Sequence, residues 1–93
     1  MSIQIEAAFP LGQLVATQTA LNHLSMSDIE AALQRHGTKD WGDLCDEDRA
    51  ENDRALLEGN RLLSAYQSAD GVTFWIITER DRSSTTVLLP EDY

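Results

Sequence analysis

Residues 62–89 read LLSAYQSADGVTFWIITERDRSSTTVLL and predict three β-strands in succession. Alternation of apolar and polar residues indicates a first strand over residues 62–67. Residues 72–78 are β-branched and aromatic and are apolar at successive positions, as in a central strand that is buried on both faces. A third strand is expected over residues 84–89, where Pro90 ends it.

Two short turns connect these strands in sequence order. The dipeptide Asp70-Gly71 is typical of a type I′ hairpin, because that turn needs positive φ and glycine has no Cβ to clash there. Residues 79–83 are polar and predict a second turn before the third strand. The three strands are therefore expected to be antiparallel and to form a meander.

Two helices are predicted before this sheet. Thr17 or Thr19 suits the N-cap of a short helix, because a threonine hydroxyl accepts a hydrogen bond from a free backbone N–H. Ser27 and Glu30 have the spacing of a capping box for a second helix, and Gly37 is expected to end it. The buried side of the second helix is predicted from residues that share one face: Ile29, Ala32, Leu33 and His36.

A third helix is predicted with a thin apolar stripe. Asp43 or Asp46 is expected to cap its start, and Gly59 follows its last residue, Glu58. The stripe consists of Leu44, Ala50, Leu57 and Leu56. Most of this helix is therefore expected to face water or a partner.

Length and element order together predict one α+β domain over residues 1–93. A chain of 93 residues suffices for one modest core. We expect two to three helices to pack on the three-stranded antiparallel meander. Residues 1–8 are expected to form a tail or an edge strand and residues 14–16 a short extended piece, which allows a fourth, N-terminal strand.

Charge is the unusual property of the composition. Sixteen Asp and Glu residues against seven Lys and Arg residues give a net charge of −9. Such a charge favours basic partners and disfavours direct binding to nucleic acid or anionic membranes. Cys45 is the single cysteine, which excludes an intramolecular disulfide and is typical of a reducing compartment. No apolar run approaches the ~20 residues that span a bilayer, so a cytoplasmic protein is expected.

Most of this charge lies in residues 40–58, called the acidic segment below. Eight acids there, set against Arg49 and Arg54, give −6 of the total of −9. Carboxylates along a helix can imitate a row of phosphates and so bind a basic protein surface. The alternative is a solvated helix face with acids near its positive end. The candidate partner-binding residues are Asp40, Trp41, Asp43, Asp46, Glu47, Asp48, Glu51, Asp53 and Glu58.

Trp41 has two interpretations within the acidic segment. It lies in a glycine-containing loop, where a tryptophan can serve as the anchor of an interface. It can also close the helix layer over the sheet as a core residue. We favour the core role, because a small domain needs its large apolar side chains inside.

The signal for catalysis is weak, and none is present for a cofactor or a metal ion. Arg80 and Arg82, followed by four hydroxyl residues at 83–86, have the donors to hold a phosphate group. Candidates for proton transfer in such a small RNA- or phosphate-directed enzyme are His23, His36 and Tyr93. A salt-bridged turn is the simpler interpretation of the two arginines. Neither a glycine-rich phosphate loop nor an EF-hand loop is present.

Six runs of the chain carry a family resemblance. They are GQLVAT (12–17), DWGDLCDED (40–48), LLSAY (62–66), WIITE (75–79), DRSSTT (81–86) and LPEDY (89–93). Over residues 9–93 the chain resembles a family of small bacterial proteins met on plasmids, integrative elements and prophages. Members are sometimes labelled plasmid-related proteins or type I restriction subunits. Gln18 stands where the family often has a proline at the start of a helix.

The resemblance implies a mobile-element setting rather than a chemistry. A restriction methyltransferase needs a cofactor domain, which 93 residues without a glycine-rich loop do not supply. Small acidic proteins in that setting often block the nucleic-acid-binding surfaces of restriction or CRISPR machinery. We therefore expect a non-enzymatic acidic module that inhibits host defence. The alternative is an accessory or regulatory subunit without that role, for which a homodimer through a sheet edge is open.

Overall fold

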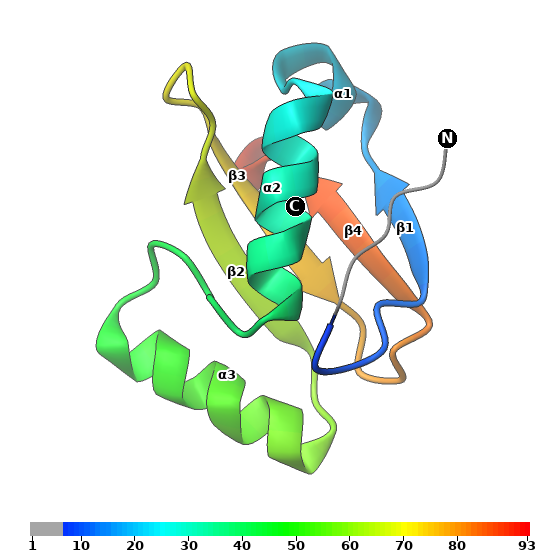
Figure 1. Cartoon of the computed structure of the whole chain (residues 1–93), viewed down its shortest axis with the longest axis vertical. Helices are drawn as coiled ribbons and strands as arrows, with labels where there is room; N and C mark the ends of the chain where they lie inside the picture. Colours follow the sequence, from blue (N-terminus) through cyan, green and yellow to red (C-terminus); the bar gives the residue numbers. More distant parts are fainter. Residues whose placement is uncertain (1–6) are drawn as a thin grey trace.

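The computed structural model describes residues 7–93, which form a mixed sheet flanked by helices (Figure 1). Residues 1–6 lie outside the described residues, and with them most of the predicted N-terminal tail or edge strand. In the described part of the chain, no helix combines the length and the apolar character needed to cross a membrane. The elements are β1 (Gln13–Ala16), α1 (Gln18–His23), α2 (Met26–Gly37), α3 (Asp46–Glu58), β2 (Leu62–Gln67), β3 (Thr73–Thr78), β4 (Ser84–Leu88) and a 3-10 helix, η1 (Pro90–Asp92).

The four strands are arranged in the order β1-β4-β3-β2. β2 pairs with β3 and β3 with β4 in antiparallel fashion, whereas β1 is parallel to β4. The structure therefore confirms the α+β fold, the antiparallel meander and a fourth, N-terminal strand. That strand contains the predicted extended piece at residues 14–16, while Ala7 and Ala8 belong to no strand.

The turn between β2 and β3 differs from the predicted type I′ hairpin. Gly71 has a φ of 83°, but Asp70 does not have the positive φ that a type I′ turn also needs. The Gly71 N–H donates to the Ser68 carbonyl (2.9 Å), and the Ser68 N–H donates to the Val72 carbonyl (2.9 Å). Ser68 and Val72 therefore enclose a three-residue turn, 69–71, with glycine in the left-handed position, and β3 begins at Thr73, one residue later than predicted.

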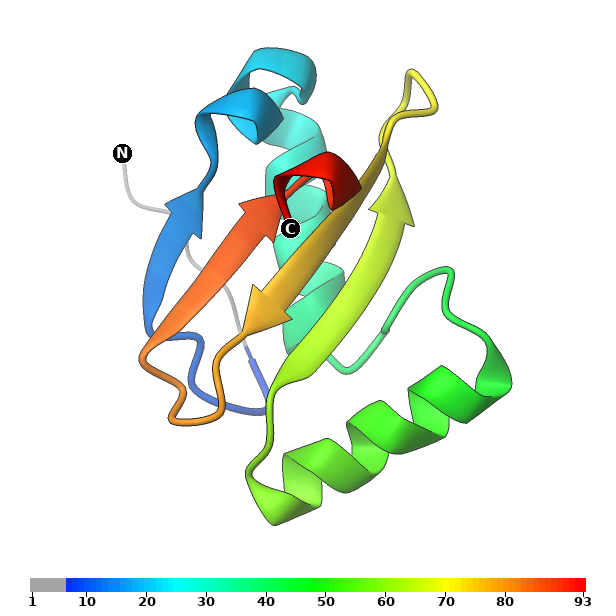
Figure 2. The same ribbon diagram turned by 180° about the vertical axis from the view of Figure 1, so that it is seen from behind.

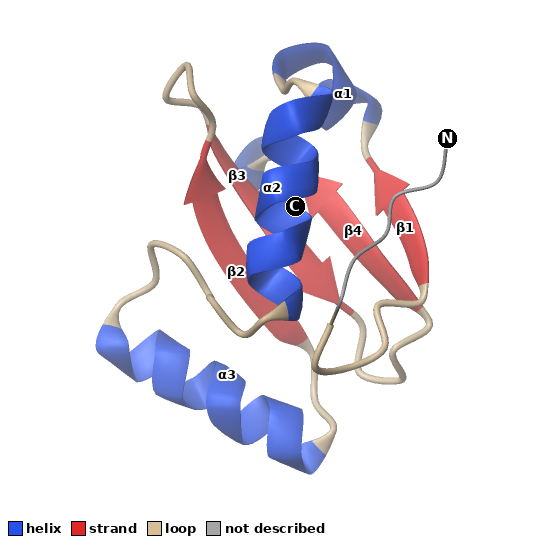
Figure 3. Cartoon of the chain, viewed as in Figure 1, coloured by secondary structure: helices blue, strands red, loops and turns tan. Residues whose placement is uncertain are grey.

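Helix α2 lies across one face of the sheet (Figures 1 and 3). The predicted buried face is confirmed, since Ile29, Ala32, Leu33 and His36 are at most 5% exposed. The aliphatic members of this face pack against strand residues of all three antiparallel strands, namely Tyr66, Phe74, Ile76 and Val87. The main core therefore lies between α2 and the sheet.

Both predicted ends of α2 are wrong by one or two residues. The helix begins at Met26, and the Ser25 hydroxyl caps it by accepting from the Asp28 N–H (3.1 Å), so Ser27 and Glu30 form no capping box. At the other end the helix includes Gly37, and Lys39 takes the positive φ of 69°. Side-chain caps compete locally, and two serines within three residues offered both positions.

The ends of α1 and α3 agree with the prediction in part. Thr17 caps α1, because its hydroxyl accepts from the Ala20 N–H (3.1 Å). Gly59 ends α3 with a φ of 75°. The N-cap of α3 is Cys45, without a side-chain hydrogen bond, so neither Asp43 nor Asp46 has the predicted role.

Helix α3 lies beside β2, outside the layer formed by α2 (Figures 1 and 2). The predicted apolar stripe is wrong at two positions, because Leu57 is 89% exposed and Ala50 is exposed as well. Leu44 and Leu56 are partly buried and pack with Ala55 in a second, smaller core. The helix meets the side of a strand rather than the face of the sheet, so it buries little apolar surface.

Candidate protein-interaction surface

The acidic segment forms the loop after α2 and the whole of α3. Two of its acids, Asp40 and Asp43, lie in the loop, and the other six lie on α3. All eight acidic side chains belong to exposed residues. The structure therefore places the predicted carboxylates at the surface, on one element and its entry loop.

Asn52 is the residue that attaches α3 to the sheet. It is the buried residue of α3, and its side-chain amide faces the outer edge of β2. The amide nitrogen donates to the Leu63 carbonyl (2.5 Å), and the amide oxygen accepts from the Leu63 N–H (3.2 Å). Asn52 thus satisfies the backbone groups that a fifth strand would otherwise pair with.

The loop before α3 covers the next position of the same edge. The Ala65 N–H donates to the Trp41 carbonyl (3.2 Å), and the Asp43 N–H donates to the Ala65 carbonyl (2.8 Å). Gly42 lies between them with a φ of 79°, and a Cβ there would come within 1.9 Å of the Ala65 carbonyl oxygen. Only glycine permits this close approach. The acidic segment is therefore fixed to β2 at two successive edge positions.

Trp41 is a core residue. It is 3% exposed and packs with Phe9 and with Leu62, while its ring meets the His36 imidazole edge-on. The indole N–H donates to the Asp53 carboxylate (3.0 Å), which ties the loop to α3. The core interpretation is correct, and Trp41 leaves the set of side chains that can contact a partner.

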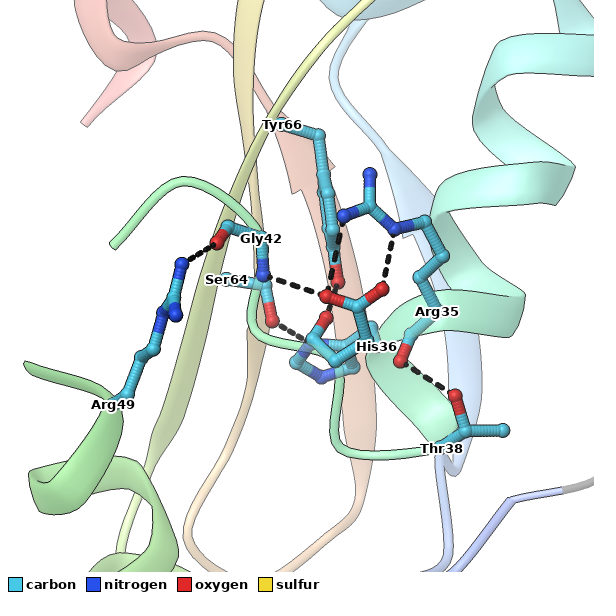
Figure 4. A network of polar contacts seen from close by, with 8 residues as sticks. Arg35, His36, Thr38, Gly42, Arg49, Ser64 and Tyr66 are labelled. Carbon is cyan, nitrogen blue, oxygen red and sulfur yellow. Dashed lines mark hydrogen bonds and ion pairs between the residues drawn. The ribbon is translucent and has the colours of Figure 1, made fainter. Parts of the chain in front are cut away.

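Asp40 supports the loop through hydrogen bonds with Arg35, Gly42 and Tyr66, which are labelled in Figure 4. Its carboxylate accepts from the Arg35 Nε (2.7 Å) and from the Gly42 N–H (3.2 Å), and its carbonyl accepts from the Tyr66 hydroxyl (2.6 Å). The hydrogen bond from Arg35 holds the pKa of the Asp40 carboxyl below its ordinary value. Burial raises the pKa of the Tyr66 hydroxyl to about 12. Asp40 is therefore committed to shaping the loop.

Five of the six acids of α3 fall into two rows when the helix is viewed along its axis at about 100° per residue, and Asp48 lies in neither. Glu47, Glu51 and Glu58 form one row, and Asp46 and Asp53 form the other. The exposed strip between the rows carries Ala50, Arg54 and Leu57.

Two arginines neutralise part of the acidic surface. Arg54 pairs with Glu51, and Arg49 lies 4.0 Å from Asp46 while also donating to the Gly42 carbonyl (3.0 Å). Among the residues that the structure describes, the carboxylates of Asp43, Glu47 and Asp48 have no hydrogen-bond or ion-pair partner. These three side chains carry charge that the fold itself does not use.

A buried polar chain through His36 lies between α2 and the sheet, with each side chain at 0% exposure. Thr85 donates to the Leu11 carbonyl (2.7 Å), so it accepts from Thr78 (2.8 Å). Thr78 has no second hydrogen and accepts from the His36 Nε2–H (2.8 Å), which leaves Nδ1 to accept from the Ser64 hydroxyl (2.6 Å). His36 is therefore the neutral Nε2–H tautomer.

Burial, reinforced by the charge of Arg82, lowers the pKa of His36 to about 4. In this hydrogen-bonded chain Ser64 lies beside His36, but both side chains are fully buried. The arrangement therefore supports the core and offers no nucleophile to a substrate. This cluster was not predicted from the sequence. Its signal was a polar residue at inward positions of three predicted strands, namely Ser64, Thr78 and Thr85.

The residues named for phosphate chemistry do not form an accessible site: Arg82 lies near His36, but His36 is fully buried, and Tyr93 and His23 have other partners. The Arg82 guanidinium donates to the carbonyls of Asn60 (2.7 Å) and Glu79 (3.0 Å), so it braces the turn. Tyr93 accepts a hydrogen bond from Arg61 (2.6 Å), and His23 bonds to the Thr19 carbonyl on α1 (2.9 Å). The salt-bridged turn is not found as such, because Arg82 is held by backbone carbonyls.

One surface hollow, of about 560 Å³, lies along residues 7–12 and Leu14. None of these residues has an acidic, basic or nucleophilic side chain. Across residues 7–93, no group of three or more His, Cys, Asp or Glu side chains is arranged to hold a metal ion. Comparison with protein-family models, with curated proteins and with solved structures found no match to this chain.

Proposed function

We propose that this protein is a small acidic protein-binding module that acts in the cytoplasm and inhibits a host defence system. Its carboxylates occupy a basic, nucleic-acid-binding surface of a restriction or CRISPR protein. One observation carries the proposal. Helix α3 carries six acids, and the residue that it buries is the polar Asn52, so it adds little to the apolar core. It is nevertheless fixed to β2 by the hydrogen bonds of Asn52 and by the close approach of Gly42 in its entry loop. We infer that such a helix is retained for the function of its exposed side.

The spacing of the acids supports imitation of a nucleic-acid strand. The 13 residues of α3 span about 20 Å and carry six acids and two arginines, so the net charge of −4 amounts to one charge per about 5 Å of axis. One strand of duplex DNA has a phosphate every ~3.4 Å. A groove lined with lysine and arginine that accepts one strand would therefore meet charge of the same sign at a somewhat lower density.

The contact surface is narrower than the acidic segment. Trp41 is in the core, while Asp40 and Asp53 hold the loop in place through Arg35 and Trp41. The carboxylates that we assign to partner contact are Asp43, Asp46, Glu47, Asp48, Glu51 and Glu58. Charges of this kind raise the association rate and make it sensitive to salt.

The test reverses charge on α3 and compares it with an equal reversal elsewhere. The triple variant Glu47→Lys, Glu51→Lys, Glu58→Lys removes one row of acids. The matched control is Glu30→Lys, Asp70→Lys, Glu91→Lys, which changes the net charge equally at exposed positions outside the segment. Circular dichroism establishes that both variants are folded.

The readout is phage plating on bacterial hosts that are protected by restriction or by CRISPR systems. The unmodified protein and the control variant should raise plating efficiency on at least one protected host, and the α3 variant should not. An equal rise in plating efficiency with both triple variants would refute the role of α3. If the unmodified protein raises plating efficiency on no host but binds another protein in a salt-sensitive way, the accessory-subunit alternative would instead be favoured.

A further inference from the structure

Strand β1 is the other edge of the sheet, and its outer side is open among the described residues. The Gln13 N–H donates to the carbonyl of Ser83, just before β4, and the Thr17 N–H donates to the carbonyl of Val87 in β4 (3.0 Å each). Because backbone groups alternate in direction along a strand, those of Leu14 and Ala16 point away from the sheet. Within residues 7–93 no strand pairs with these groups, so they can pair with a further strand.

The two edge strands of the sheet differ in how their outer backbone groups are covered. The β2 edge is closed by Asn52 at Leu63 and by the Gly42 loop at Ala65. β1 has no proline, bulge or charged side chain, which are the usual means of preventing strand addition. The contrast indicates that β1 is left open for pairing.

An apolar surface continues from this edge onto the helices. A groove of about 130 Å³ lies between β1 and α2, with Ile29 and Leu33 at its floor. The large apolar side chains around it are unusually exposed: Leu14 39%, Val15 41%, Leu21 46% and Met26 55%. A partner that pairs with β1 would cover these side chains as well.

The distribution of charge along the chain indicates what kind of partner could bind at the β1 edge. Residues 7–27 contain no Asp, Glu, Lys or Arg, in a chain with a net charge of −9. Two copies repel each other through most of their surface, and this neutral stretch is where they can approach. Glu30, one turn beyond Met26 on α2, is the first acid beside the patch that the chain leaves exposed.

The acidic helix is also remote from the β1 edge. β1 and α3 lie at opposite ends of the sheet (Figures 1 and 2). Three strand spacings separate β1 from β2, which is about 14 Å. In a dimer joined at β1, the two α3 helices would be about 30 Å apart, several times the Debye length of ~8 Å.

We propose that a second copy of this chain pairs antiparallel with β1 and forms a continuous eight-stranded sheet. The two-fold axis passes beside Val15, so that Leu14 of one protomer exchanges both backbone hydrogen bonds with Ala16 of the other. Val15 then lies opposite its own symmetry mate in a non-hydrogen-bonded pair. Leu14 and Met26 of both protomers close the apolar grooves. This proposal does not rest on the proposed function.

The first experiment is sedimentation equilibrium of the full chain under reducing conditions, because Cys45 is exposed. The expected mass is twice 10.4 kDa, with little dependence on salt. Val15→Lys should yield a folded monomer by placing two like charges at the axis. The matched control, Gln67→Lys, adds the same charge to the exposed end of the other edge strand and should leave the dimer intact.

The second experiment keeps the proposal testable if Val15→Lys fails to fold. In a Cys45→Ser background, Val15→Cys should form a disulfide between copies on mild oxidation, since opposite residues in a non-hydrogen-bonded pair are close enough. Gln13→Cys, two residues from the axis, should not. A mass of 10.4 kDa at all concentrations would overturn the proposal. So would a dimer that resists Val15→Lys or that forms no Val15→Cys cross-link.

Discussion

The side-chain amide of Asn52 makes with the backbone of Leu63 the two hydrogen bonds that a neighbouring strand would make, at 2.5 and 3.2 Å. Through this pair, and with Ala55 and Leu56 packed against the smaller core, an acidic helix is attached to the edge of the sheet. The same pair closes an edge that would otherwise bind another strand. The buried Asn52 amide therefore both stabilises the fold and fixes the position of the acidic helix.

Asn52→Ala should destabilise the protein by about 1–3 kcal/mol, because it leaves the Leu63 N–H and carbonyl unpaired at a partly buried site. Urea unfolding measures the loss, and hydrogen exchange should show faster exchange of the Leu63 amide. Asn22→Ala, an exposed asparagine on α1, is the control and should change stability by less than about 0.5 kcal/mol. Unchanged exchange at Leu63 would contradict the attachment.

Gly42→Ala should be much more harmful than Gly71→Ala. Both glycines have positive φ, 79° and 83°, so both substitutions carry a similar backbone strain of about 1 kcal/mol. A Cβ at Gly42 also meets the Ala65 carbonyl oxygen at 1.9 Å, whereas one at Gly71 meets nothing within 4 Å. The difference between the two losses in unfolding free energy isolates the close approach of the loop to β2. Equal losses would show that the loop does not need this contact.

Stability should fall with pH below about 6.5 because of His36. Its pKa is about 4 in the folded protein against 6.5 in the unfolded chain, so between these values the unfolded state binds more protons. The contribution is fully present above pH 6.5 and is lost progressively down to pH 4, by an amount on the order of 3 kcal/mol.

Unfolding free energy at pH 7 and pH 5 measures this effect of His36. His36→Gln should be less stable at pH 7 and should lose most of the pH dependence in this window, whereas His23→Gln, at an exposed position of α1, should retain it. An NMR titration that gives His36 an ordinary pKa would refute the burial argument.

Trp41→Phe should lower stability by about 1 kcal/mol, since it removes the indole hydrogen bond to Asp53 and keeps most of the apolar packing. Asp53→Ala should cost a similar amount. If the hydrogen bond is the shared cause, the double variant should cost less than the sum of the two single losses. Additive losses would show that the Trp41–Asp53 bond contributes nothing.

Sequence patterns predicted those elements that depend on interactions between residues close together in the chain. Periodicity located β2, β3 and β4, and threonine and glycine preferences located the start of α1 and the end of α3. The predicted N-cap of α2 was Ser27 and the observed one is Ser25, because two serines in three residues suit a cap and the local pattern does not distinguish them. The stripe of α3 was wrong at Leu57 because no local pattern records that a helix meets the side of a strand.

The sequence by itself determined that this is an α+β protein with an antiparallel meander, that two-thirds of its net charge lies in residues 40–58, and that residues 7–27 are neutral. Those properties depend on neighbours in the chain. Tertiary structure alone decided between the two interpretations of Trp41, showed that Asn52 and Gly42 bind the β2 edge, and placed β1 at the opposite edge, where none of residues 7–93 pairs with its outer side. Each of these features depends on hydrogen bonds and contacts between residues that are distant in the chain. Such contacts leave no periodic pattern in the sequence around either residue.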